Sequence, residues 1–241
     1  MGKQYAVYHS QKGRGSGAGL GNHIDREKGK EHSYRNADPS RLKNNVNFGI
    51  LEKDEFGNTV DVSKLSLEKA ISYRIKSGYK KDVAIRKDAV KYISHILTGS
   101  HEQMMKIGGN KEQFKKWVLK NQKFVVDEFG RNNLVRFTLH LDETTPHIHC
   151  VTVPITPEGG LSAKRVFGNK KAMQERQDRY AEAMKEFGLH RGQRNFKVKH
   201  QDVTRFYGNL QETKTKLEAV KDDLPPFLPR HRINPKSYLE A

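Results

Sequence analysis

Cysteine and long apolar runs are what this sequence most plainly lacks. Only one of its 241 residues is cysteine, Cys150, so no disulfide can form within the chain, and a reducing compartment fits. Because Cys150 lies in an apolar stretch, we expect a buried, inert thiol there rather than a nucleophile. No stretch approaches the roughly 18 apolar residues of a membrane span, and the N-terminus lacks the apolar core of a secretory signal. These absences predict a cytoplasmic protein without a membrane span.

Acidic residues are also few in comparison with basic ones. Asp and Glu total 28 against 45 Lys and Arg, which gives a formal net charge of +17. Such an excess indicates a polyanionic partner, and nucleic acid is the commonest one. An anionic membrane surface is the alternative, but the positive charge is spread along the whole chain rather than along one amphipathic helix. The hydrophobic fraction of 34% is low for a compact domain, so we expect part of the chain to be a polar loop or appendage.

Strand-like and helical patterns are interspersed along the chain. Alternating or β-branched segments predict strands at residues 4–9, 46–51, 89–97 (where a helix is also possible), 133–141 and 147–155. Apolar residues at helical spacing predict helices at residues 66–76, 111–129 and 170–187, the last two ended by glycine. The adjacent strands 133–141 and 147–155, joined by a short turn, indicate antiparallel pairing. We therefore predict an α/β (α+β) fold with a central, mostly antiparallel sheet flanked by helices.

A glycine-rich run at residues 13–19 resembles a phosphate-binding loop at first sight. It has four glycines in seven residues, but no Gly-Lys-Ser/Thr follows, as a Walker loop requires. A dinucleotide-binding fingerprint would need an amphipathic helix and a downstream acid, and neither is evident. We interpret the run as a flexible connector; that its backbone amides hold a phosphate is the alternative.

Three histidines at the junction of the two best strand predictions indicate a metal site. Successive side chains of a strand point to opposite faces, so His147 and His149 project from one face. The short turn brings His140 alongside this pair. Three imidazoles would leave coordination positions open, as in catalytic sites, and they suit Mn²⁺, Co²⁺, Ni²⁺ or Zn²⁺ better than Mg²⁺. The alternative is three solvated histidines at the end of a strand.

Two carboxylates, Asp142 and Glu143, lie between the histidines in the sequence. Either could bind the metal, orient an imidazole or accept a proton. Either could also be an ordinary turn residue, which leaves their roles open at this point.

With these motifs in view, the chain resembles plasmid mobilisation relaxases of the MobV type, the Mob/Pre plasmid recombination family within the HUH endonucleases. Three blocks carry the resemblance: HIDR at residues 23–26 with NADPSR at 36–41, HLDETTPHIH at 140–149, and LSAKRVFG at 161–168 before a helix ending near residues 187–192. Together they extend from about residue 3 to about residue 195. Residue 24 is isoleucine here, where the family usually has asparagine.

The resemblance implies an activity and assigns roles to residues. Such enzymes nick one DNA strand at an origin of transfer by metal-assisted transesterification, form a covalent 5′-phosphate adduct and later rejoin the strand. The nucleophile of this family is a histidine that matches His23, and Arg26 would pair with the phosphate or orient the site. Glu143 is the third catalytic candidate, and Mn²⁺ is the favoured metal. A tyrosine nucleophile is the alternative, with Tyr5, Tyr8 and Tyr34 as candidates.

Basic residues on both sides of the histidine block are candidate DNA contacts. Those we select are Arg41, Arg74, Arg86, Lys164 and Arg165. Phosphate contacts from such residues would make the affinity fall with salt. The expected DNA is an origin of transfer that is hairpin or single-stranded near the nick, and the conjugation machinery is an expected partner.

The resemblance also divides the chain. We predict a relaxase catalytic domain at residues 1–198, a charged helix at 199–224 and a polar, proline-containing tail at 225–241. The charged helix is a possible start of a coiled-coil region and a possible dimer contact. Two other functions stay open: a rolling-circle replication initiator with a tyrosine nucleophile, and a non-catalytic DNA-binding protein with a structural metal.

Overall fold

The computed structural model describes residues 3–54 and 56–192. The chain divides into two units, residues 1–194 and 195–241, and all described residues belong to the first. The predicted charged helix at 199–224 and the tail at 225–241 therefore lie outside the described residues. No helix within the described ranges is both long and apolar enough to cross a membrane.

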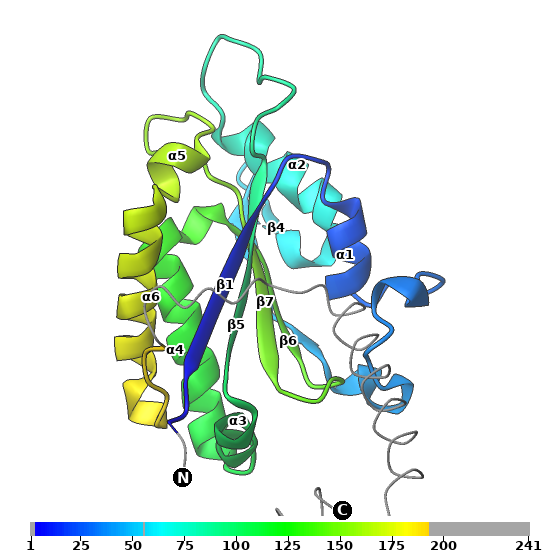
Figure 1. The fold of residues 1–241 in the computed structure, drawn as a ribbon. Helices are drawn as coiled ribbons and strands as arrows, with labels where there is room; N and C mark the ends of the chain where they lie inside the picture. The colour runs from blue at the N-terminus through cyan, green and yellow to red at the C-terminus, as the bar shows by residue number, and fades with distance from the viewer. Residues whose placement is uncertain (1–2, 55, 193–241) are drawn as a thin grey trace, which may run out of the picture. The chain divides into compact units, whose positions relative to one another are not determined.

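A five-stranded antiparallel sheet forms the centre of the described domain (Figure 1). Its strand order is β1-β5-β7-β6-β2, with β1 at Ala6–Gly13, β5 at Tyr92–Gly99, β7 at His147–Thr152, β6 at Leu134–His140 and β2 at Val46–Asn47. All four pairings are antiparallel. The predicted fold class is confirmed. A separate two-stranded sheet pairs β3 (Leu51–Lys53) with β4 (Thr59–Asp61).

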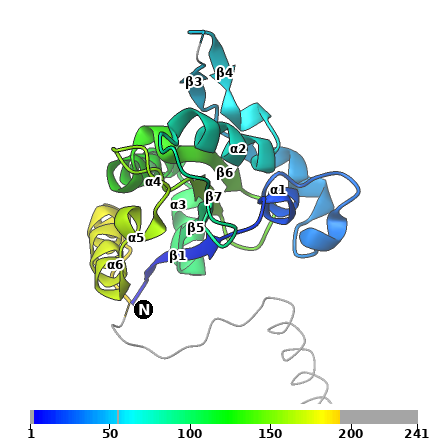
Figure 2. The same ribbon diagram turned by 90° about the horizontal axis from the view of Figure 1, so that it is seen from above.

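Helices cover both faces of the sheet (Figures 1 and 2). On one side lie α4 (Lys111–Phe129) and α6 (Lys170–Met184), and on the other lie α1 (Ala18–Ile24) and α2 (Leu67–Gly78). Two shorter helices, α3 (His101–Gly108) and α5 (Ala163–Val166), complete the set, together with 3₁₀ turns at Glu31–Ser33, Pro39–Asn44, Val62–Lys64, Arg131–Asn133 and Lys185–Phe187.

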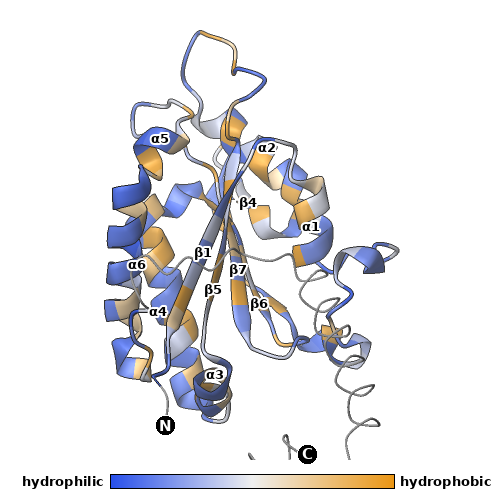
Figure 3. Cartoon of the chain, viewed as in Figure 1, coloured by the Kyte–Doolittle hydropathy of each residue, from blue (hydrophilic) through white to orange (hydrophobic). Residues whose placement is uncertain are grey.

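Part of the hydrophobic core lies between the sheet and helices α4 and α6. Trp117, Phe124 and Phe129 of α4 are buried there, as are Tyr180 and Met184 of α6. Figure 3 shows the apolar residues of both helices on the side that faces the sheet. Burying one large apolar side chain contributes about 1.5–3 kcal/mol, so this packing stabilises the sheet that carries the histidines on its opposite face.

On that opposite face, a close approach between α1 and α2 sets the position of His23. A Cβ added to Gly21 would lie 2.9 Å from Cβ of Leu67, closer than real side chains allow, so only glycine fits between the helices here. Ser66 begins α2 by accepting a hydrogen bond from the amide of Lys69. His23 lies in the last turn of α1, and the glycine contact holds that turn against α2.

The structure corrects several sequence-based predictions. The glycine run at residues 13–19 is not a connector throughout, because Gly13 ends β1 and α1 begins at Ala18. The predicted strand 46–51 is divided between β2 and β3, which belong to different sheets. Helix α3 was not predicted, and β5 begins three residues later than expected. The predicted helix 170–187 is α6 followed by a 3₁₀ turn, and Gly188 ends it with a left-handed φ of 73°.

Candidate functional site

The hairpin of β6 and β7 brings the three predicted metal-ligating histidines together. His140 ends β6 and pairs in register with His147 at the start of β7, and His149 is two residues further on. Their ring centroids lie 4.7–5.1 Å apart. All three side chains are buried on the face that α1 and α2 cover. Burial lowers the pKa of His140 to about 3 and places the pKa of His149 well below its ordinary value, so both imidazoles are neutral at neutral pH.

The Nε2 atoms of His147 and His149 lie close enough together for both to reach one divalent ion. Nδ1 of His147 lies 2.9 Å from the Thr145 carbonyl oxygen, which accepts its N–H and leaves Nε2 with a lone pair. The Nε2 atoms of the two histidines are 3.1 Å apart. Two nitrogens bound at right angles to one ion, each at about 2.0–2.2 Å, lie about 3 Å apart. The pair thus has the spacing of two adjacent ligands.

His140 offers a third nitrogen that could bind a metal, and Arg26 contacts it. Nε2 of His140 lies 2.8 Å from the Ile24 carbonyl, so it carries the proton and donates it there. Nδ1 accepts from Nη2 of Arg26 at 2.9 Å, because a guanidinium has no acceptor. The lone pair that would bind a metal is therefore the one that Arg26 contacts, and metal binding at Nδ1 requires this contact to open.

Arg26 is the centre of a charged network next to the histidines. Its Nε lies 2.7 Å from Oδ2 of Asp142, and its Nη2 lies 3.0 Å from Oδ1 of Asp142 and 2.7 Å from Oε1 of Glu143. Its Nη1 donates to the His23 carbonyl at 2.8 Å. The residue has a left-handed φ of 52°, which costs a non-glycine residue about 1 kcal/mol, and the buried contacts to its side chain offset that cost.

Asp142 is fully buried and holds Arg26 in place. Burial alone would raise the pKa of Asp142, but hydrogen bonds from Arg26 and Asn45 outweigh it and the pKa lies below its ordinary value. Asn45 bridges the turn: Nδ2 donates to Asp142 at 2.7 Å, and Oδ1 accepts from the Leu141 amide at 2.7 Å. Asp142 therefore remains a carboxylate and fixes the guanidinium.

His23 lies against the histidine cluster, and one of its two ring nitrogens is held by a backbone carbonyl. Its ring centroid is 5.1 Å from that of His149 and 6.1 Å from that of His140. Its Nδ1 lies 2.7 Å from the Ser33 carbonyl, which fixes the ring and leaves Nε2 unprotonated in the neutral imidazole. Burial lowers the pKa of His23 below its ordinary value, despite the opposing effect of the Ser33 bond. Potential ligand atoms of His23, His140 and His149 lie within 4.8 Å of one another, as do those of His140, Glu143 and His147.

The alternative tyrosine nucleophiles are placed differently. Tyr8 is buried on the other face of the sheet, where its hydroxyl lies 2.9 Å from Nδ1 of His95. Tyr34 is close to the site, but its hydroxyl donates to the Glu27 carbonyl at 3.1 Å, and its ring lies under the Arg26 guanidinium. Tyr5 precedes β1 and bridges to His190.

The five predicted DNA contacts lie in three places. Arg41 donates a hydrogen bond to the Leu141 carbonyl, in the turn between β6 and β7. Arg86 and Lys164 line a cavity of about 420 Å³ together with Lys12 and Arg14. Arg74 lines a second cavity of about 750 Å³. Arg165 lines this second cavity too and forms an ion pair with Glu158.

Two partners of the site, Asn45 and the Ser33 carbonyl, have no signal in the sequence. Asn45 stands in a run of asparagines that carries no motif, and only the fold brings it to Asp142. The Ser33 carbonyl is a backbone group, which no residue pattern could reveal.

Comparisons with known proteins place this chain in a family. The family model described as plasmid recombination enzyme, Mob/Pre, matches residues 3–208. The chain belongs to the Mob/Pre family. A plasmid recombination enzyme type 3 of Staphylococcus aureus is 33% identical over 192 residues, which are 78% of this chain and 43% of that protein. A plasmid recombination enzyme of Lactiplantibacillus plantarum is 30% identical over 207 residues, which are 85% of this chain and 53% of that protein. This Mob/Pre chain thus spans about half the length of such relatives or less.

Solved structures of a Mob/Pre relaxase domain share the fold. The MobM relaxase domain, bound to origin-of-transfer DNA of plasmid pMV158 and to Mn, matches with a TM-score of 0.70 and 28% identity. The match covers 85% of this chain and 98% of that domain. A second Mn-bound structure of the same domain, with a 22-nucleotide DNA, gives a TM-score of 0.68 at 28% identity.

Proposed function

We propose that this Mob/Pre domain is a relaxase that nicks one strand of DNA at a plasmid or mobile-element origin of transfer and later rejoins it. The observation that carries the proposal is the position of His23, whose ring lies 5.1 Å from that of His149 in the buried histidine cluster. A nucleophile and a metal site so close together can act on the two sides of one phosphate. Homologous domains bound to origin DNA and Mn support the same assignment.

The nucleophile in this proposal is Nε2 of His23. The Ser33 carbonyl holds the proton on Nδ1, and burial keeps the ring neutral, so Nε2 presents a lone pair. Attack on phosphorus forms an N–P bond and breaks the bond to the 3′ oxygen, which leaves with a proton from water as a free hydroxyl. The new phosphoramidate conserves the energy of the phosphodiester, so the 3′ hydroxyl can reverse the step and rejoin the strand.

His140, His147 and His149 would hold a divalent metal, with Mn²⁺ favoured, and Co²⁺, Ni²⁺, Zn²⁺ or Mg²⁺ as alternatives. When bound, such an ion acts as a Lewis acid on a phosphate oxygen. Arg26 would orient the site and stabilise negative charge on the phosphate, held by Asp142. Glu143 would position Arg26 or take up a proton near His147, from which its carboxylate is 3.8 Å away.

The proposed partner is DNA, bound in part through Arg41, Arg74, Arg86, Lys164 and Arg165. We also propose a cytoplasmic location, where plasmid DNA resides, and contacts with the conjugation machinery. Dimerisation through a C-terminal helix remains a prediction. Residues 1–198 are the proposed catalytic domain.

A nicking assay tests the proposal and its alternatives. Oligonucleotides that tile the DNA upstream of the gene are labelled at either end, incubated with the protein and Mn²⁺, with or without chelator, and separated on a denaturing gel. The relaxase proposal predicts a nick only with metal, with protein attached to the 5′ end of the product. Salt-sensitive DNA binding without a nick under any metal would support the non-catalytic alternative and overturn the proposal. Retention of the adduct in His23→Ala would favour a tyrosine nucleophile, as in rolling-circle initiators.

A further inference from the structure

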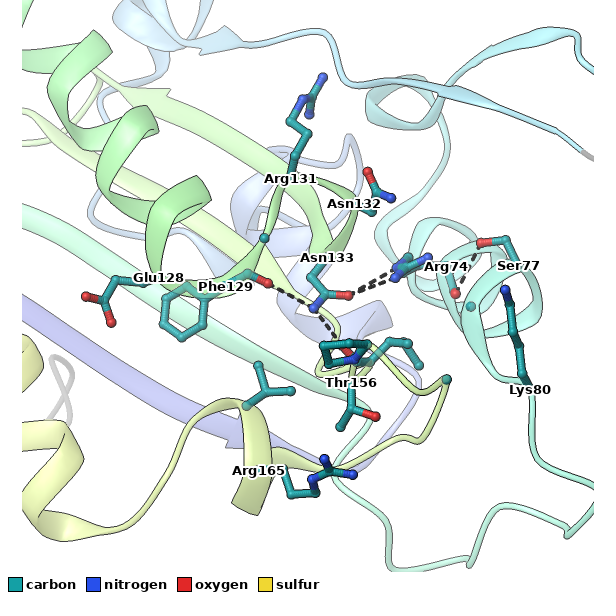
Figure 4. Close-up of a pocket in the computed structure, with 16 residues that line it drawn as sticks. Arg74, Ser77, Lys80, Glu128, Phe129, Arg131, Asn132, Asn133, Thr156 and Arg165 are labelled. Carbon is teal, nitrogen blue, oxygen red and sulfur yellow. Dashed lines mark hydrogen bonds between the residues drawn. The ribbon is translucent and has the colours of Figure 1, made fainter.

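A basic cavity lies at the end of the sheet opposite the histidine cluster. It has a volume of about 750 Å³ and is formed by the end of α2, the start of β6 and the loop after β7 (Figure 4). Asn133 directly precedes β6, whose other end is His140, and Ile155 follows β7, which begins at His147. The cavity is therefore separate from the proposed catalytic site.

Four cationic side chains line the cavity, Arg74, Lys80, Arg131 and Arg165, and only one carboxylate, Glu128. Glu128 is already neutralised, because Arg176 lies 2.9 Å and Arg179 2.5 Å from its oxygens. Arg165 pairs with the exposed Glu158. Across the described ranges, no carboxylate forms an ion pair with Arg74 or Arg131. The lining therefore carries an excess of positive charge.

Arg74 is held by a neutral partner rather than by a carboxylate. Its Nε and Nη2 lie 3.2 Å and 3.0 Å from Oδ1 of Asn133. Asn133 is itself fixed, since its Nδ2 donates to the carbonyls of Phe129 and Ile155, each at 2.9 Å. Burial lowers the pKa of Arg74, and Glu52 on β3 opposes this from a distance. A half-buried guanidinium oriented by an amide retains its full charge for a ligand.

The fold leaves space for this guanidinium. A Cβ added to Gly78, at the end of α2, would lie 2.7 Å from Nη1 and 2.9 Å from Cζ of Arg74. The segment just after α2 is joined to the loop after β7, because the amide of Lys80 donates to the Gly159 carbonyl at 2.9 Å. This backbone hydrogen bond thus joins two of the segments that line the cavity.

We propose that this cavity binds phosphate groups of the DNA backbone at a distance from the scissile phosphate, as a second contact of the same substrate. This inference rests on the proposed function, because it takes DNA as the ligand. A cavity that binds phosphate groups could take them either from a DNA backbone or from free phosphate. The net charge of +17 and the exposure of Arg131 favour a DNA backbone over free phosphate as the ligand.

The sheet sets the length of DNA that can reach both places. The seven residues of β6 span about 23 Å at about 3.3 Å per residue. Duplex DNA covers that distance in about seven base pairs at about 3.4 Å each. DNA much shorter than this can contact the catalytic site or the cavity, but not both.

The test measures binding without chemistry, so that it does not depend on nicking. Mixed-sequence duplexes of 4–16 base pairs are titrated by fluorescence anisotropy against the His23→Ala protein in chelator, over a range of salt concentrations. The affinity of this protein should rise by about tenfold once the duplex exceeds about seven base pairs. Adding Arg131→Ala, which removes an exposed side chain, should reduce this rise to about threefold or less and lower the salt slope by about one unit. Arg74→Gln should do the same while keeping a hydrogen bond to Asn133.

Lys116→Ala is the matched control, since it removes one positive charge from an exposed position on α4. It should keep both the length dependence and the salt slope. Equal losses in Lys116→Ala and Arg131→Ala would show a general effect of net charge and overturn the proposal. Calorimetry with inorganic phosphate separates the two sources: phosphate binding that is lost in Arg131→Ala, with an unchanged length dependence for DNA, would assign the cavity to free phosphate instead.

Discussion

At the scale of single residues, Arg26 connects the proposed nucleophile to the proposed metal ligands. One guanidinium contacts the His23 carbonyl, Nδ1 of His140 and the carboxylates of Asp142 and Glu143. No other side chain among the described residues touches all four. A substitution of Arg26 should therefore change the nicking rate without weakening metal binding.

Replacing Arg26 should impair nicking without weakening metal binding. Arg26→Lys keeps the charge but loses the forked geometry, and nicking should fall about 10²-fold, as when one donor to a transition state is removed. The Kd for Mn²⁺ should be unchanged or lower, because the contact that occupies Nδ1 of His140 is lost. Gel assays for nicking and calorimetry with Mn²⁺ measure the two effects. A parallel loss of Mn²⁺ affinity would mean that Arg26 acts by building the metal site.

The sequence predicted the histidine cluster because the pattern is local. His147 and His149 alternate on a strand, and the turn from His140 is short, so secondary structure alone brings the three together. The partners that orient them come from distant segments. Asn45 is 97 residues from Asp142, and no spacing rule connects them.

At the scale of elements, ion pairs join α4 and α6, the two helices that cover one face of the sheet. Glu128 of α4 accepts from Arg176 and Arg179 of α6, and Arg176 is buried beneath the rings of Phe129 and Phe167. Burial would raise the pKa of Glu128, but the two arginines outweigh it and hold the pKa below its ordinary value of 4.5.

Glu128→Gln should therefore destabilise the domain at neutral pH. A buried Arg176 without its carboxylate should cost about 2 kcal/mol, a Tm decrease of about 4–8 °C. Because the folded pKa is below the unfolded one, the stabilisation is complete above about pH 4.5 and is lost as the pH falls through the folded pKa. Thermal melts of both proteins from pH 7 to pH 3 should converge at acid pH. Glu175→Gln, at an exposed position on α6, is the control and should change Tm little.

The sequence predicted the long elements more accurately than the short ones. Helix α4 has the predicted bounds, Lys111–Phe129, because its apolar stripe is long and a glycine ends it. Helix α1 has only seven residues, two of which are glycine, and its packing on Leu67 rather than its propensity stabilises it. The same tertiary dependence explains why β2 and β3 could not be separated from sequence.

At the scale of the whole molecule, the proposed metal connects folding to function. The three histidines come from one hairpin, while His23 and Arg26 come from the N-terminal segment that packs over it. An ion bound by the folded state alone would stabilise the domain.

Mn²⁺ should raise the Tm of the domain, and chelator should reverse the effect. At a metal concentration of about 100 times Kd, the gain should be about 2.7 kcal/mol, or roughly 5–10 °C. His147→Ala should lose most of the shift. His190→Ala, which removes an exposed histidine beside the start of β1, should retain it. An equal shift in all three proteins would mean that Mn²⁺ binds elsewhere.

The chemical nature of the covalent adduct tests the central claim most directly. The adduct formed with Mn²⁺ on a nicked oligonucleotide is purified, divided, and exposed to mild acid or to neutral buffer before mass spectrometry of the tryptic peptides. A bond to Nε2 of His23 is a phosphoramidate, so the account predicts that acid releases the DNA, and that the neutral sample carries nucleotide on the peptide containing His23. An acid-stable adduct on a peptide containing a tyrosine such as Tyr34 would contradict the account.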